Sequence, residues 1–78
     1  MALKFAVCIQ KSGMGDFSTD DLTVGRLYEV IAEEPHAMLR IVDDSGEDYL
    51  YPAKCFEMVT IQGEAAERIH DALSLLAA

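Results

Sequence analysis

The side chains best able to do chemistry are four carboxylates crowded around a Ser-Gly pair. They are Asp43, Asp44, Glu47 and Asp48. Several oxygen ligands close together could hold a hard cation such as Ca²⁺, but this spacing does not match that of an EF-hand loop. We therefore expect a solvated hairpin tip and no metal site, with Asp and Ser favouring the turn. In a hairpin with a two-residue loop, Asp43 would face Asp48 and the two charges would repel. Binding of a partner that carries cations therefore stays an alternative.

The histidines and cysteines give no sign of catalysis or metal binding. His36 and His70 have no Cys, Asp or Ser at a spacing that would build a nucleophilic pair, so we expect both on the surface. Cys8 and Cys55 lack the Cys-x-x-Cys spacing of metal and redox sites. In a reducing compartment they are expected to be small buried hydrophobic residues. The sequence thus predicts no catalytic residue, no metal and no cofactor.

The charge balance limits the classes of partner. The chain has 78 residues, six of them basic and 14 acidic, for a net charge of −8. The basic residues are scattered singly, whereas a surface that follows nucleic-acid phosphates needs neighbouring cations, so nucleic-acid binding is unlikely on this sequence. The surplus acid could serve solubility, attraction to a basic partner or mimicry of nucleic acid.

The apolar segments are too short for targeting or membrane insertion. The N-terminal apolar run is shorter than the core of a signal peptide, and no segment approaches the ~20 apolar residues of a membrane span. We expect a cytoplasmic protein with no membrane contact. The length allows one domain with a small core.

Five strands are predicted from apolar alternation and from β-branched and aromatic residues. They cover residues 3–10, 26–32, 38–44, 48–51 and 56–61. An irregular loop follows the first strand, with Phe17 as its expected anchor, and Gly25 suits the tight turn before the second strand. Residues 52–55 should form one tight turn that begins at Pro52.

The hairpin at Ser45 and Gly46 has two open registers. A two-residue loop pairs Arg40 with Tyr51 and places Leu50 on the face of Ile41. A loop longer by one residue turns Tyr51 inward instead of Leu50. In the first register Tyr49, Tyr51 and Arg40 could form an exterior contact patch with Tyr28, but the sequence favours a core position for Tyr28 and one other tyrosine.

The chain beyond residue 61 changes to a helical period. An apolar stripe centred on Ile69 lies opposite Glu64, Glu67, Asp71 and Ser74, as in an amphipathic helix. Its other members are Ala65, Ala66, Ala72, Leu73 and Leu76. Burial of Ile69, Leu73 and Leu76 is worth on the order of 4–8 kcal/mol, so the stripe must be covered. It should pack on the chain's own strands or on another protein.

The order of these elements resembles the SH3-like barrel. The segments that carry the resemblance are "LTVGRLYEVI", a turn and strand, and "YPAKCFEMV", a proline, helical turn and last strand. More narrowly, the chain resembles small bacterial and phage-type SH3-like proteins. The resemblance implies an all-β, five-stranded barrel at residues 1–61 and an added helix at 62–78. It does not imply polyproline binding, because only Pro52 matches the aromatic shelf of peptide-binding SH3 domains.

These patterns favour a small, non-enzymatic protein-interaction or self-association module. Its candidate contact residues are Tyr49, Tyr51, Arg40, Ile69, Leu73 and Leu76, and its partner is an unknown protein or a second copy. The alternative is an acidic inhibitor that mimics nucleic acid. An enzyme or small-ligand binder is a third hypothesis, which requires a pocket with convergent titratable groups.

Overall fold

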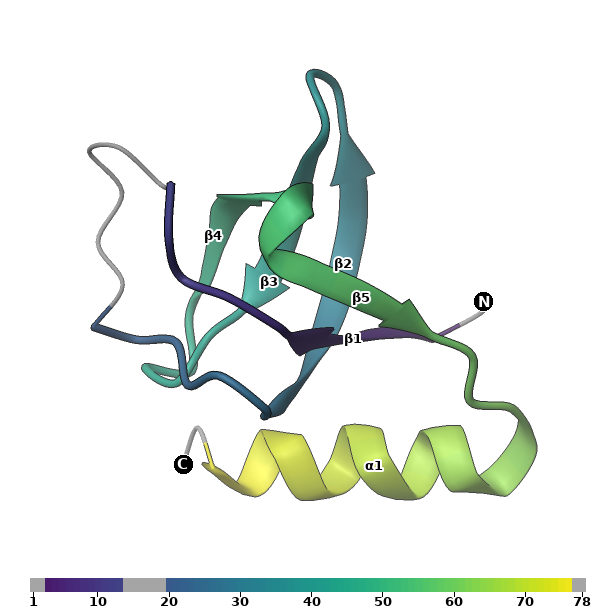
Figure 1. Cartoon of the computed structure of the whole chain (residues 1–78). Helices are drawn as coiled ribbons and strands as arrows, with labels where there is room; N and C mark the ends of the chain where they lie inside the picture. The colour runs from purple at the N-terminus through teal and green to yellow at the C-terminus, as the bar shows by residue number, and fades with distance from the viewer. Residues whose placement is uncertain (1–2, 14–19, 77–78) are drawn as a thin grey trace.

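One antiparallel sheet and one C-terminal helix make up the structure (Figure 1). It is a computed structural model, which describes residues 3–13 and 20–76. The strands are β1 (Lys4–Cys8), β2 (Leu27–Glu34), β3 (Met38–Val42), β4 (Asp48–Pro52) and β5 (Phe56–Val59), and the helix is α1 (Gly63–Leu76). In the sheet they lie in the order β4-β3-β2-β1-β5. The predicted five strands and helix are confirmed, in a fold that is mostly β rather than all-β.

The connections follow the turn chemistry expected from the sequence. Gly25 and Gly46 both have positive φ, at 88° and 85°, which glycine adopts without steric cost. Residues Ala53–Cys55 form a single 3-10 turn between β4 and β5. Pro52 precedes this turn in an extended conformation, and the amide of Ala53 donates to the carbonyl of Ala37 at 2.8 Å. The expected anchor Phe17 lies outside the described residues.

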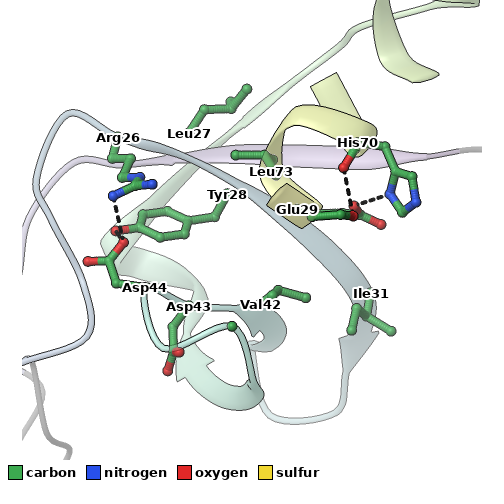
Figure 2. A pocket seen from close by; sticks show the side chains of 12 residues that line it. Arg26, Leu27, Tyr28, Glu29, Ile31, Val42, Asp43, Asp44, His70 and Leu73 are labelled. Atoms are coloured by element: carbon green, nitrogen blue, oxygen red, sulfur yellow. Dashed lines mark hydrogen bonds and ion pairs between the residues drawn. The ribbon is translucent and has the colours of Figure 1, made fainter. Parts of the chain in front are cut away.

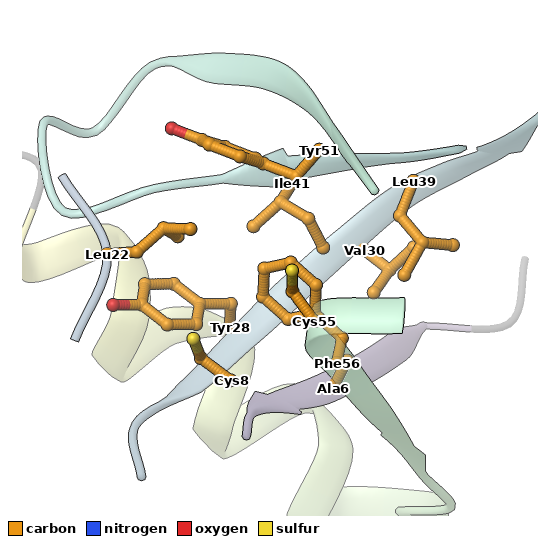
Figure 3. Close-up of a cluster of buried hydrophobic side chains, with 10 residues drawn as sticks. All are labelled: Ala6, Cys8, Leu22, Tyr28, Val30, Leu39, Ile41, Tyr51, Cys55 and Phe56. Atoms are coloured by element: carbon orange, nitrogen blue, oxygen red, sulfur yellow. The ribbon is translucent and has the colours of Figure 1, made fainter. Parts of the chain in front are cut away.

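A cluster of buried side chains fills the concave side of the sheet (Figure 3). It contains Ala6, Cys8, Leu22, Tyr28, Val30, Leu39, Ile41, Tyr51, Cys55 and Phe56. The rings of Tyr28 and Phe56 meet edge to face, with their centroids 6.3 Å apart. Both cysteines are free and buried, as predicted, and burial raises the pKa of each thiol.

The helix lies against the opposite side of the sheet (Figure 1). Successive residues of a strand point to opposite faces. Because Ala6 and Cys8 enter the cluster, Phe5, which precedes Ala6, faces the helix side, where it is fully buried. Ala66 is the buried residue of α1. Part of the apolar stripe therefore lies against the chain's own sheet, and the rest of it remains partly exposed.

The turn between β2 and β3 holds two non-glycine residues in left-handed conformations. His36 has φ 66° and Ala37 has φ 56°. This region costs an L-residue roughly 1–2 kcal/mol, and Ala37 is exposed, so its side chain offers little packing in return. The β2–β3 turn thus stores backbone strain.

We predict that Ala37→Gly raises the free energy of unfolding by about 1 kcal/mol, because glycine adopts positive φ without strain. Urea denaturation would measure the change. Ala32→Gly, at a position of β2 without positive φ, is the matched control and should lower stability by roughly 0.5–1 kcal/mol. A loss of stability in both variants would contradict the prediction.

Candidate functional site

Each carboxylate of the acidic hairpin has a partner within the chain. Tyr51 donates to Asp43, Tyr28 to Asp44 and Tyr49 to Glu47, at 2.7, 2.8 and 2.9 Å, and Arg40 pairs with Asp48 at 3.1 Å. The three tyrosine hydroxyls thus all bind acids of one turn. Among the described residues, no group of three or more His, Cys, Asp or Glu side chains is arranged to hold a metal ion.

Asp43 corrects the expectation of a fully solvated hairpin tip. It is only 5% exposed. Its Oδ1 accepts from the amide and hydroxyl of Ser45, at 2.9 and 2.5 Å, and its Oδ2 accepts from Tyr51. A buried carboxylate is costly unless it is hydrogen-bonded, and here both oxygens are used. Asp43 and Asp48 do not face each other, since the ladder pairs Asp48 with Val42.

The hairpin takes the longer of the two expected loops. The ladder pairs Leu39 with Tyr51 and Arg40 with Leu50, so the two-residue register is wrong. Asp43 and Glu47 close the loop through a backbone hydrogen bond of 3.0 Å, with Gly46 in the left-handed position. This is the common three-residue hairpin with a bulged glycine. The Asp43 side chain stabilises it by accepting from the Ser45 amide, an interaction typical of Asx turns.

The observed register does not bring the expected contact patch of Tyr49, Tyr51 and Arg40 together on one surface. Tyr51 is 5% exposed and belongs to the core, and its burial and the bond to Asp43 raise the pKa of its phenol. Tyr49 is half-exposed and shares the inner face with Tyr51. Arg40 lies on the outer face, paired with Glu34 and Asp48. These side chains do not form one surface.

Asp44 joins the hairpin to the start of β2. It accepts from the hydroxyls of Tyr28 and Thr23, and Arg26 lies 3.2 Å from it. The hydroxyl of Tyr28 also accepts from the Thr23 amide, at 2.7 Å. Burial, aided by the bond to Asp44, raises the pKa of Tyr28 to about 12. The phenol therefore stays neutral at physiological pH.

A groove of about 300 Å³ lies between α1 and the outer face of β2 and β3 (Figure 2). Its apolar lining comes from Leu27, Ile31, Val42 and Leu73. The pairs Arg26–Asp44 and His70–Glu29 also line it. The polar side chains at the groove are thus bound to one another, and its free surface is mainly apolar.

Ile31 lies on the outer face of β2, because strand side chains alternate and its neighbour Val30 points into the cluster. The ladder steps from Val30–Ile41 to Ala32–Arg40, which leaves Ile31 as the extra residue of a β-bulge. Its side chain is 53% exposed. Sequence reasoning missed this residue, because an isoleucine in an apolar strand reads as core.

His70 is a helix–sheet contact rather than a free surface histidine. Its Nδ1 lies 2.5 Å from Oε1 of Glu29, across the boundary between α1 and β2. The imidazole is partly exposed, whereas Glu29 is largely buried. The hydrogen bond to Glu29, and then its charge, raise the pKa of His70.

The helix candidates occupy different positions. Ile69 and Leu73 are both half-buried, and Leu73 also lines the groove. Leu76 is the last residue of α1, and its side chain lies outside the described part of the structure. Leu75, which the stripe did not include, is 76% exposed. The groove therefore brings together Leu73 with residues of β2 and β3 that the sequence did not single out.

Comparison with protein families, curated proteins and solved structures returned no match for this chain. Among the described residues, no helix has the length and apolar character needed to cross a bilayer. Function is therefore inferred from the groove and the charge of the molecule.

We predict that Tyr51→Phe lowers the free energy of unfolding at pH 7 by about 1.5–3 kcal/mol, because a buried hydrogen bond to a carboxylate is lost. Urea denaturation would measure it. Tyr49→Phe removes an equivalent bond at an exposed site and should cost less. Equal losses would contradict a special role for the buried pair.

The same tyrosine should set the alkaline limit of stability. Its folded pKa lies above the unfolded value of about 10, so the stabilisation is complete below pH 10 and lost as pH rises. Between pH 10 and 12, wild-type stability should fall more steeply than that of Tyr51→Phe, by at most about 1.4 kcal/mol per pH unit. Parallel slopes in urea unfolding would refute this.

We predict that Glu29→Gln lowers the pKa of His70, measured by NMR titration of its ring protons. Because the folded pKa is raised, the contact stabilises helix docking below about pH 6.5 and loses this effect as pH rises through the folded pKa. Glu57→Gln, an exposed carboxylate on β5, should leave the pKa of His70 unchanged. A pKa insensitive to Glu29→Gln would disprove the coupling.

Proposed function

We propose that this protein is a small, non-enzymatic protein-interaction module, and that the groove between α1 and the sheet is where it binds its partner. The observation that carries the proposal is the exposed apolar surface of the groove. Ile31 is 53% exposed beside the half-buried Leu73 and Val42, so three large aliphatic side chains leave apolar surface together at one place. Exposed apolar surface rimmed by polar groups is typical of an interaction site.

The polar groups at the groove support binding rather than a reaction. A general base or nucleophile needs a free proton acceptor or an activated donor directed at a substrate. Here Glu29 is bound to His70, and Asp44 already accepts from two hydroxyls. These bonds hold the walls of the groove in place, which preorganises a surface for a partner.

We propose further that the strands form an SH3-like barrel. The strand order, the three-residue β3–β4 hairpin and the single 3-10 turn before β5 support this assignment. The additional helix distinguishes the chain from a minimal barrel, and the proposed site depends on it. A fold of this kind hosts many functions, so the assignment does not by itself name a partner.

The alternative function, inhibition by mimicry of nucleic acid, has less support. Such a surface needs a row of exposed charges that imitate phosphates. The densest acidic segment instead uses Asp43 inside the protein and Asp44 to join two segments of the chain. The net charge of −8 remains available to attract a basic partner.

We predict that Ile31→Asp and Leu73→Asp abolish partner capture when the tagged protein is expressed in its native cell and its bound proteins are identified by mass spectrometry. A charge in the groove opposes burial of the partner's apolar side chains. Ile9→Asp is the matched control, since Ile9 is 48% exposed and lies outside the groove. Identical capture by all variants would rule out the groove as the binding site.

A further inference from the structure

On α1, apolar side chains are left uncovered toward the C-terminal half of the helix. Ala66, in the first turns of the helix, is buried against the sheet. Leu73 is only half-buried at the groove, and Leu75 is 76% exposed. Covering such surface is worth about 25 cal/mol for each Å² removed from water. The groove can therefore contribute to the affinity of a partner that inserts apolar side chains.

The strands below the groove cannot accept another strand. The sheet runs β4-β3-β2-β1-β5, so β2 and β3 are interior and have sheet neighbours on both sides. Addition of a peptide strand requires an exposed edge, which in this order belongs to β4 and β5. Recognition at the groove must use side chains. An amphipathic helix meets this requirement, since it presents apolar side chains at helical spacing to a groove.

The charge of the molecule indicates the chemistry of that helix. Four of the six basic side chains, Lys4, Arg26, Arg40 and Arg68, already form ion pairs within the chain. The surplus of acid remains, and Glu67 and Asp71 are exposed on α1, about one turn before and directly after His70, which lines the groove. A second copy would bring the same net charge of −8 and be repelled. A basic segment would be attracted to the acidic surface.

We infer that the groove receives a basic amphipathic helix of another protein, with apolar residues on the buried face and lysine or arginine on its flanks. The inference rests on the proposed function and specifies the partner's chemistry. Leucine-sized side chains of the helix fill the space between Ile31, Val42 and Leu73. The flanking cations lie over the exposed acids of α1. The apolar contacts supply affinity, and the charges supply attraction and selection against acidic helices.

The test uses three synthetic helical peptides that share the same leucine stripe. All remaining positions are lysine in the first peptide, glutamine in the second and glutamate in the third. Binding to the full chain is measured by fluorescence anisotropy, and methyl NMR shifts locate it. The lysine peptide should bind and shift the methyl signals of Ile31, Val42 and Leu73. Its dissociation constant should increase at least about tenfold in Ile31→Asp, which corresponds to roughly 1.4 kcal/mol. Ile9→Asp should bind it like the wild type.

Several outcomes would overturn the inference in distinguishable ways. Equal binding of the lysine peptide by Ile31→Asp and Ile9→Asp would place the contact outside the groove. Tighter binding of the glutamine or glutamate peptide, with groove shifts, would retain the docking site but refute a basic partner. A doubled mass in sedimentation that Ile31→Asp returns to the monomer value would make the occupant a second copy. Failure of every peptide, together with partner capture that is unaffected by Ile31→Asp, would refute the proposed function as well.

Discussion

The buried carboxylate of Asp43 links the β3–β4 loop, the register of β4 and the core. Such a group is tolerated only when its oxygens are hydrogen-bonded, and Ser45 and Tyr51 supply these bonds. The amide of Ser45 can donate only if the loop takes three residues, and the hydroxyl of Tyr51 can donate only if its ring points inward. One polar side chain therefore selects the loop, the register of β4 and the inward tyrosine together. Because side chains alternate along a strand, the register that turns Tyr51 inward also turns Leu50 outward.

Asp44 extends this polar arrangement to the opposite side of the core. Its bonds to Tyr28 and Thr23 connect the β3–β4 hairpin to the segment before β2. Small domains bury too little apolar surface to hold distant segments by packing alone. Tyr28 and Tyr51 add polar connections, since each packs its ring in the cluster and donates a hydrogen bond to a carboxylate at the edge of the cluster. The acidic hairpin is thus a structural element with its charges directed inward as well as outward.

Local patterns in the sequence predicted much of the fold. Alternation identified the strands, the change to a helical period identified α1, and Gly25 and Gly46 marked turns that need positive φ. The register of β3 and β4 could not be predicted from such patterns, because two loop lengths fit the same residues. The choice between them depends on a hydrogen bond between Asp43 and Tyr51, which are eight positions apart in the sequence. The groove could not be predicted from local patterns either. It depends on where α1 docks on the sheet, which is set by tertiary packing.

In the groove and the hairpin, polar groups bind to one another within the chain, whereas apolar groups of the groove remain exposed. Carboxylates near the core accept hydrogen bonds from tyrosines, and those at the groove pair with arginine and histidine. These bonds stabilise the walls of the groove but leave few polar groups free to bind a ligand. The surplus charge acts over a longer range and is screened by salt. It follows that charge should govern how fast a partner arrives, whereas contacts with Ile31 and Leu73 should govern how long it stays. The proposed site would therefore select partners by amphipathic pattern and charge sign rather than by a specific hydrogen-bond code.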